Sequence, residues 1–180
     1  KGFAMLKGKL MRMMGTQATA SCGAVIAHHQ APLGAVMREL RAAEQRAKTE
    51  GGRDAFSITV IKRSGGALTL TEKWGNPLAL LNSLIDFLRD PGVSRRAVYH
   101  TLEWLHDLPD PKGDGAMLES LLAYQLARQA DKSAEVQAPD LASRLAALTV
   151  TQSGQRLDWL QNFLTVAEFL AREIRTGVQA

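Results

Sequence analysis

The spacing of hydrophobic and polar positions changes along this 180-residue chain. Ala18 to His29 is small, β-branched or apolar throughout, which is typical of a strand buried on both faces. Leu33 to Lys48 repeats apolar positions at helical spacing, and Ala55 to Lys62 alternates as a strand does. Gly and Ser at 64–66 predict a hairpin turn, and Leu68 to Trp74 predicts the return strand. The first part of the chain is therefore predicted to be a β–α–β unit with an added antiparallel strand.

Helical spacing flanks this unit on both sides. Phe3 to Met14 is predicted to be the end of an amphipathic helix. From Asn76 onward, breakers rich in Pro, Gly and Asp separate five amphipathic segments. The five predicted helices are Leu78–Arg89, Arg95–His106, Ala116–Lys132, Leu141–Thr149 and Gln155–Arg175. Short-linked amphipathic helices predict a bundle, so we expect an α+β chain with a sheet unit over residues 1–75 and an all-α unit over residues 76–180.

Three residues stand where helix N-caps are expected, namely Ser94, Asp140 and Ser153. The boundary between the two parts is predicted at Gly75 to Pro77, where the strand pattern ends and the helical pattern begins.

Charge is shared unevenly between the two parts. Residues 1–75 carry 12 Lys and Arg against 5 Asp and Glu, a net charge of +7, whereas residues 76–180 carry a net charge of −3. This asymmetry suggests that the first part binds phosphates and that the second part binds protein. Two surfaces that only face solvent would give the same net charges. Cys22 is the single cysteine, so no internal disulfide can form, which fits the reducing cytoplasm. No apolar run approaches the ~20 residues that span a bilayer, so no membrane association is expected.

Several residues in the first part are candidates for binding chemistry. Lys48 stands in the last turn of its predicted helix, where the helix dipole favours a lysine and from where its charge could also reach a triphosphate, beside Arg53. Gly23 interrupts a strand, which indicates either the close approach of another group or a bulge. His28 and His29 do not predict a metal site, because neighbours in a strand point to opposite faces.

Arg95 and Arg96 follow Ser94 at a predicted helix start. Cations there oppose the helix dipole by up to ~1 kcal/mol. The pair is therefore expected either to bind an anion, which would be a nucleic-acid phosphate or a partner carboxylate, or to remain solvated.

Catalytic signatures are absent from the sequence. It contains no Ser-His-Asp order, no CxxC pair and no P-loop, and residues 1–75 place no paired carboxylates on a strand or hairpin. Two-metal phosphoryl transfer needs such carboxylates to hold its ions. We therefore assign no catalytic residue and no metal ligand.

Short blocks in both parts resemble one known family. In the first part they are Met14-Gly15, Ala18-Thr19, Ser21, Gly23, Ile26-Ala27-His28, Pro32-Leu33, Ala43-Glu44, Ala47-Lys48 and Lys62-Arg63-Ser64-Gly65. In the second they are Ser94-Arg95-Arg96 with Tyr99, and Phe169-Leu170-Ala171-Arg172-Glu173. The blocks resemble the second palm domain and the C-terminal helical domain of the polymerase/cyclase-like large subunit of type III CRISPR effector complexes, particularly the Cmr type (III-B). The resemblance implies a partial ferredoxin-like palm of the nucleotidyl-cyclase kind, followed by a helical bundle domain.

The resemblance also implies an activity for the full-length protein. Subunits of this family join ATP into cyclic oligoadenylates when the complex binds a foreign transcript, using Mg or Mn, and many also cut single-stranded DNA with an HD domain. By resemblance, Ser21 and Gly23 lie near the nucleotide, and Lys48 with Arg53 meets its phosphates. The Gly-Gly-Asp-Asp hairpin that holds the metals is absent and is expected just upstream of Lys1. These 180 residues alone are therefore expected neither to cyclise ATP nor to cut DNA.

Partners follow from the same resemblance. The helical part is expected to pack beside the small helical subunits of a Cmr-type complex, close to the duplex of guide RNA and target RNA, with Arg95 and Arg96 as nucleic-acid or partner contacts. Two other interpretations stay open. One is a fragment of a diguanylate cyclase, which the long helical part disfavours, and the other is a non-catalytic helical binding module.

Overall fold

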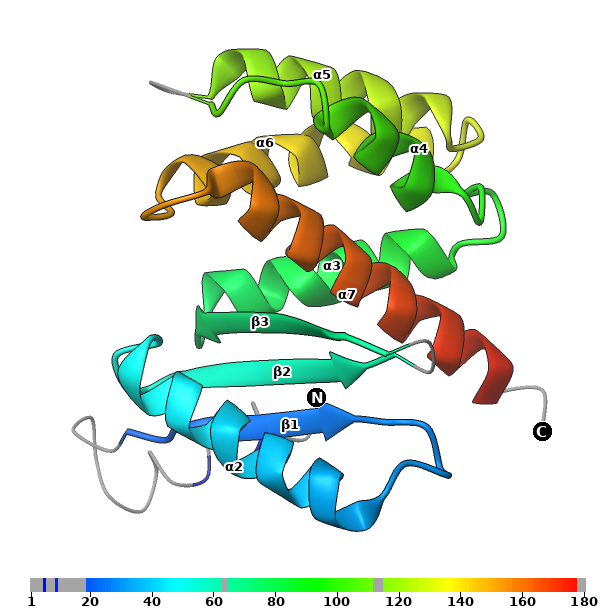
Figure 1. Cartoon of the computed structure of the whole chain (residues 1–180). Helices are drawn as coiled ribbons and strands as arrows, with labels where there is room; N and C mark the ends of the chain where they lie inside the picture. The colour runs from blue at the N-terminus through cyan, green and yellow to red at the C-terminus, as the bar shows by residue number, and fades with distance from the viewer. Residues whose placement is uncertain (1–4, 6–8, 10–18, 63–64, 112–114, 178–180) are drawn as a thin grey trace. The chain divides into compact units, whose positions relative to one another are not determined.

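The computed structural model describes residues 5, 9, 19–62, 65–111 and 115–177, with side chains up to residue 174. The chain divides into two compact units, Lys1–Leu78 and Ala79–Ala180, close to the boundary expected at Gly75–Pro77. Within the described residues there are three strands and six α-helices, so the predicted α+β class is confirmed (Figure 1). The helix expected over Phe3–Met14 lies outside the described residues, apart from Met5 and Lys9.

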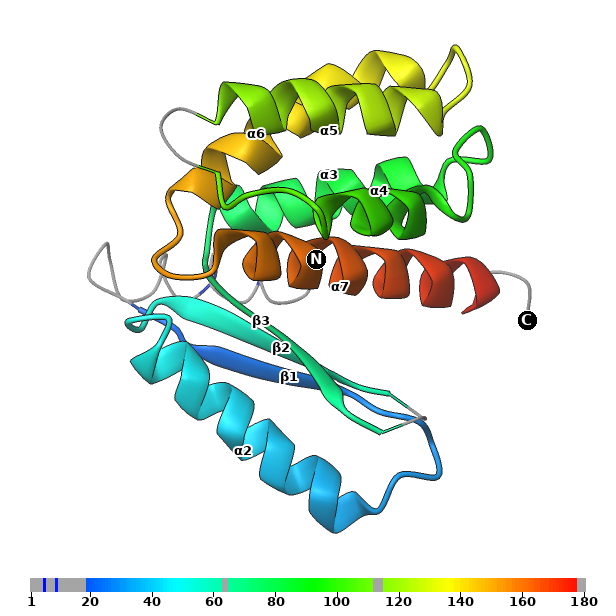
Figure 2. The same ribbon diagram turned by 45° about the horizontal axis from the view of Figure 1, so that its top comes forward.

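The first unit contains a mixed sheet with the strand order β1-β2-β3. Strand β1 (Cys22–Ile26) pairs parallel to β2 (Ala55–Ile61), and β2 pairs antiparallel to β3 (Ala67–Lys73). Helix α2 (Leu33–Thr49) connects β1 to β2 and covers one face of the sheet (Figure 2). The order of elements is as predicted. Strand β1 is shorter than predicted because the chain leaves the ladder after Ile26 and turns towards α2.

Small residues let α2 lie very close to the sheet. A Cβ atom at Gly23 would stand 2.4 Å from the backbone nitrogen of Glu44. Ala43 and Ala47 of the helix and Ser57 of β2 are fully buried at the same contact. The close approach predicted at Gly23 is therefore made by the helix backbone, and the alternative of a bulge is wrong because β1 pairs with β2 in unbroken register.

The opposite face of the sheet carries the large apolar side chains. Phe56, Val60 and Leu70 are buried and alternate along their strands with the small residues beneath α2. Trp74 follows β3, and its Nε1–H donates to the carbonyl oxygen of Ala20 at 2.6 Å. Its ring centroid lies 5.4 Å from that of Phe56. These contacts fix the chain just before β1, where the candidate site begins.

The second unit is built from helices. They are α3 (Asn76–Arg89), which starts in the last residues of the first unit, α4 (Ala97–Leu105), α5 (Ala116–Arg128), α6 (Ala138–Val150) and α7 (Arg156–Gly177). A 3-10 turn, η1 (Glu135–Gln137), precedes α6. Helix α5 packs along α6, and α7 contacts both α4 and α6. Fully buried side chains fill the space between them, including Leu84, Phe87, Leu122, Leu145 and Phe163.

Two helices begin differently from the prediction. Ser94 does not cap α4, because its Oγ accepts the backbone N–H of Arg96 at 3.2 Å and the helix begins only at Ala97. Helix α6 begins at Ala138, so Pro139 lies in its first turn instead of before it. Proline is tolerated there because the first N–H groups of a helix have no partner within the helix.

The other predicted caps also fall in different places. Asp140 lies within the first turn of α6 and bonds the Arg144 guanidinium at 3.2 Å, and Ser153 lies before α7, which begins at Arg156. Cap positions depend on the local backbone path, which sequence spacing predicts only to within a few residues.

Helix α5 ends four residues earlier than predicted. Ala130 forms a bridge with Val93, which takes the chain out of the helix. Asp131 then accepts hydrogen bonds from the backbone N–H groups of Ser133 and Ala134 and from the Ser133 hydroxyl. These hydrogen bonds hold the pKa of the Asp131 carboxyl below its ordinary value. The carboxylate thus organises the turn that leads into α6.

Candidate functional site

The predicted nucleotide contacts lie at one end of the first unit. Glu44 of α2 stands directly over Gly23 of β1, and the helix runs antiparallel to the strand (Figure 2). Four helical residues advance by ~6 Å, which is about two strand residues. Lys48 therefore lies level with Ser21, the residue before β1. Ser21 is two residues before Gly23, so the strand alternation places both on the same face.

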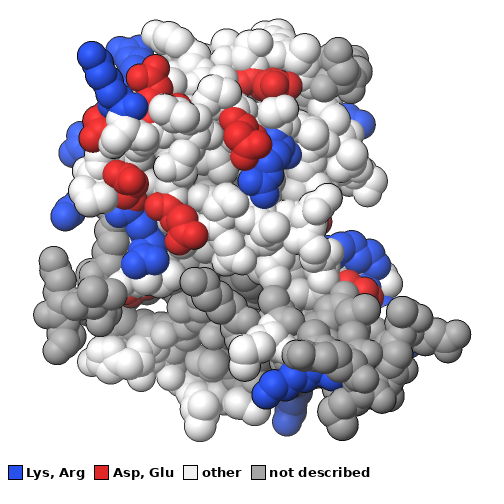
Figure 3. All heavy atoms as spheres, turned by 180° about the vertical axis from the view of Figure 1, so that it is seen from behind, with Lys and Arg blue, Asp and Glu red and all other residues white. Residues whose placement is uncertain are grey.

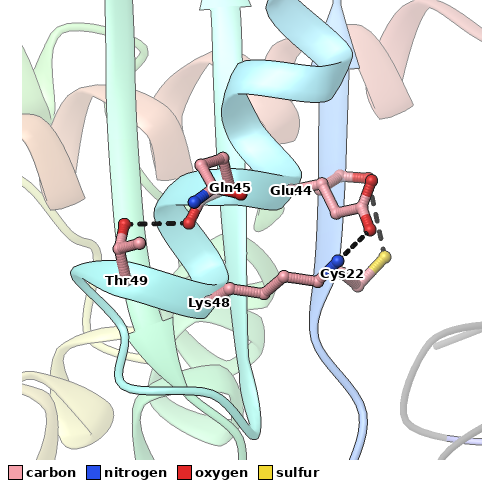
Figure 4. A network of polar contacts seen from close by, with 6 residues as sticks. Cys22, Glu44, Gln45, Lys48 and Thr49 are labelled. Atoms are coloured by element: carbon pink, nitrogen blue, oxygen red, sulfur yellow. Dashed lines mark hydrogen bonds and ion pairs between the residues drawn. The ribbon is translucent and has the colours of Figure 1, made fainter.

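Lys48 is exposed and has a carboxylate partner. Its Nζ bonds Oε1 of Glu44 at 2.6 Å, and the two side chains are 42% and 51% exposed (Figure 4). The hydrogen bond and the charge of Lys48 hold the pKa of the Glu44 carboxyl below its ordinary value. Because exposed ion pairs are weak, a polyphosphate can compete with this single carboxylate for the ammonium group.

The Glu44 carboxylate also lies close to the Cys22 thiol (Figure 4). Burial raises the pKa of the Cys22 thiol, and the nearby Glu44 carboxylate raises it further. The Sγ–H donates to the carbonyl oxygen of Gly23 at 3.5 Å. Both effects disfavour the thiolate, so the Cys22 thiol is less reactive than an ordinary exposed thiol.

Replacing Glu44 by Gln is expected to speed alkylation of Cys22. The substitution removes the negative charge that disfavours the thiolate, so the pKa of the thiol falls and the reactive fraction rises. The measurement is the rate of iodoacetamide labelling at pH 8, followed by mass spectrometry. Glu39→Gln on the same helix is the matched control and should leave the rate unchanged. Equal rates in the Glu44→Gln and Glu39→Gln variants would contradict the electrostatic cause.

Arg53 lies in a strained loop that follows the C-terminal end of α2. Arg53 and Asp54 adopt left-handed φ angles of 59° and 45°, which cost non-glycine residues ~1–2 kcal/mol each. Lys73 Nζ donates to the carbonyl oxygens of Gly52 and Arg53 at 3.0 and 2.8 Å. Asp54 Oδ1 accepts the backbone N–H of Ala20 at 3.4 Å. The loop is therefore tied to the start of β1 and the end of β3, and it carries the exposed Arg53 side chain at a defined place.

The two adjacent histidines lie beyond β1, in the turn that leads to α2. Their ring centroids are 4.2 Å apart, so the prediction that His28 and His29 point to opposite faces of a strand is wrong. His28 Nδ1 accepts the backbone N–H of Gln30 at 3.3 Å. Within the described part of the chain, no group of three His, Cys, Asp or Glu side chains is placed to hold a metal ion.

Arg95 and Arg96 lie in the second unit, where they line a cleft together with Tyr99 and Arg172. Sequence reasoning singled out the two adjacent arginines but gave no sign that α7 would supply the facing wall. Glu44 was likewise missed as the partner of Lys48, although its position four residues earlier in the helix is the usual signal for such a pair.

Comparison with known proteins finds a family similar to part of the first unit. Residues 4–57 match the family model described as Cas10/Cmr2, second palm domain. The N-terminal part of this chain is similar to the second palm domain of Cas10/Cmr2 proteins. The Cas10/Cmr2 match includes Ser21, Gly23, Lys48 and Arg53, and it covers less than a third of the chain. No curated protein matches the chain.

The palm match supports an origin of the chain in the large subunit of a type III CRISPR effector complex. It supports this interpretation over a fragment of a diguanylate cyclase or an unrelated binding module. The helical unit lies outside the matched residues. No helix in the described ranges combines the length and the apolar character needed to cross a bilayer.

Proposed function

We propose that the Cas10/Cmr2 palm unit forms one wall of the ATP pocket in which a type III-B effector complex makes cyclic oligoadenylates. The observation that carries the proposal is the position of Lys48, an exposed cation level with Ser21 within the matched residues. Arg53 adds a second cation at the same end of the unit. The C-terminal end of a helix is the negative end of its dipole, so side chains must supply the positive charge that a triphosphate requires there.

Each residue of this wall has a distinct part in the proposal. Lys48 and Arg53 bind phosphate oxygens, and the Ser21 hydroxyl orients the nucleotide by a hydrogen bond. Gly23 acts indirectly, because the helix backbone fills the space above it and that close seating sets the position of Lys48. Mg²⁺ or Mn²⁺ bound with ATP would neutralise phosphate charge.

We further propose that the helical unit docks onto the small helical subunits of the complex in the cytoplasm, near the guide RNA and the target RNA. On the face shown in Figure 3, acidic and basic side chains of the upper, helical part lie close to one another. Such mixed charge suits a polar protein interface more than a long stretch of phosphate backbone. The support for RNA proximity is Arg95 and Arg96, which are both exposed.

Lys48→Ala in the full-length subunit is expected to reduce cyclic oligoadenylate synthesis about tenfold or more while the complex still assembles. A hydrogen bond to a charged group is worth ~1.5–3 kcal/mol, and the variant removes one to a phosphate. The measurement is product formation from ATP by the purified complex after addition of target RNA, with subunit composition checked by native mass spectrometry.

Two control variants separate phosphate binding from helix stability. Glu44→Gln breaks the same ion pair but keeps the Lys48 cation, so synthesis should persist. Lys62→Ala removes an exposed cation after the far end of β2 and should also have little effect. Unchanged synthesis in Lys48→Ala, or an equal loss in Glu44→Gln, would remove Lys48 from the proposed pocket.

A further inference from the structure

Helices α4 and α7 border a cleft of about 540 Å³ within the helical unit. The side chains that line it come from the start of α4 and from α7. They include Arg95, Arg96, Tyr99, Thr165, Glu168 and Arg172. All of them belong to the one compact unit Ala79–Ala180.

Three of the eight residues that line the cleft are arginines. Arg95 and Arg96 are exposed, and within the described part of the chain neither has a carboxylate at ion-pair distance. Arg172 faces them from α7 and is itself 57% exposed. Its Nη1 lies 3.7 Å from Oε1 of Glu168, which is the one acidic side chain in the lining. The Nε atom of Arg172 also lies 3.6 Å from Oε1 of Glu173. Three guanidinium groups against these two carboxylates leave a net positive charge, which favours an anionic ligand.

An aromatic ring stands beside these cations. Tyr99 is 60% exposed, and it follows Arg96 by three residues, so the two side chains lie on the same side of the helix start. Its ring contacts His100 edge-on, with centroids 5.8 Å apart. That contact leaves most of the Tyr99 surface open to a flat partner.

The combination of groups favours a single nucleic-acid strand over the other anions. An extended strand offers a phosphate for arginine and an unstacked base for an exposed aromatic ring, whereas a duplex keeps its bases stacked inside. An acidic peptide could also pair with the arginines, but a peptide usually binds through apolar side chains that need an apolar pocket as well. The apolar residues Val98 and Leu102 of the lining are buried and half-buried, so the exposed ring of Tyr99 is the larger surface open to a ligand.

We propose that the α4/α7 cleft binds a single-stranded nucleic acid, with phosphates on Arg95, Arg96 and Arg172 and one base stacked on Tyr99. The inference rests on the docking role proposed above for the helical unit, and it names the chemistry of one partner. It is independent of the ATP pocket.

The test uses the full 180-residue chain with fluorescently labelled 12-nucleotide strands of uridine RNA and thymidine DNA. Fluorescence anisotropy gives the dissociation constant over a series of salt concentrations, with no ATP and no other subunit present. Its outcome is therefore separate from that of the messenger assay. Preference for one of the two strands identifies whether RNA or DNA is the natural source, and binding of either supports the cleft.

Substitutions in the cleft are expected to weaken binding selectively. Arg95→Glu with Arg96→Glu should weaken it more than tenfold and reduce the slope of log K against log salt by about 1.4, since each phosphate contact to a single strand contributes ~0.7. Tyr99→Ala should weaken binding about fivefold or more through lost stacking, and Tyr99→Phe should retain it.

The matched control is Arg38→Glu with Arg41→Glu on the exposed side of α2, which makes the same change in net charge. It should weaken binding less than threefold. Circular dichroism checks that every variant keeps its helix content. An equal loss in the control, no binding of either strand, or stronger competition by a 12-residue polyglutamate than by unlabelled strand would overturn the proposal.

Discussion

Gly23→Ala is expected to destabilise the palm unit by about 3 kcal/mol, the upper end of the usual cost of overpacking a buried contact. The added Cβ would stand 2.4 Å from the Glu44 nitrogen and 2.9 Å from the Ala43 carbonyl carbon. Both are backbone atoms, so α2 as a whole must move away from β1. That movement also displaces Lys48, and messenger synthesis by the full-length subunit should fall together with stability.

The same substitution at Gly34 provides the control. Gly34 lies near the start of α2, and a Cβ there would meet only the end of the Arg38 side chain at 3.8 Å. Because alanine is the better helix former, Gly34→Ala should stabilise the unit, by at most ~1 kcal/mol. Hydrogen exchange of the amides of β1 and α2 measures both effects. Equal protection in the Gly23→Ala variant and the unsubstituted chain would show that the helix is not seated as closely as described.

Phe163→Ala is expected to destabilise the helical unit by ~3–5 kcal/mol. Phe163 is fully buried in the middle of α7, and its ring centroid lies 5.0 Å from that of Trp159. Removing it leaves a cavity that rigid neighbouring helices can fill only in part. Hydrogen exchange should therefore show lost protection in α6 and α7.

Met117→Ala is the matched control for this second substitution. Met117 is 63% exposed on α5, so its truncation should change stability by less than ~0.5 kcal/mol. Unchanged protection in Phe163→Ala would contradict the packing of α7 as the core helix of this unit. Comparing the two variants also separates a specific core effect from a general loss of apolar surface.

The type and order of the secondary-structure elements follow from local sequence spacing. Strand, helix, strand and hairpin in the first unit, and five helices in the second, occur where the apolar positions predict them. The boundaries are less well determined, as Ser94 and Pro139 show, because a helix start depends on which backbone groups find partners in nearby turns.

The burial of α2 shows how tertiary packing selects among apolar positions. Spacing predicts one continuous stripe that starts at Leu33, yet Leu33 is 74% exposed and Met37 is 41% exposed. Only the part of the stripe with Ala43 and Ala47 is fully buried, because close contact with the sheet admits only small side chains there. Periodicity reports which face can be buried, and the shape of the partner surface decides how much of it is.

The sequence by itself determined the α+β class, the order of the elements and, through its resemblance to a palm domain, which residues to examine at the end of α2. Only the tertiary structure shows that the α2 backbone lies against Gly23, that Glu44 forms an ion pair with Lys48, and that Arg172 faces Arg95 across a cleft. The physical reason is the separation along the chain of the residues that determine each feature. Backbone periodicity is set by neighbours a few residues apart, whereas a binding surface forms where packing brings together side chains that are distant in the chain.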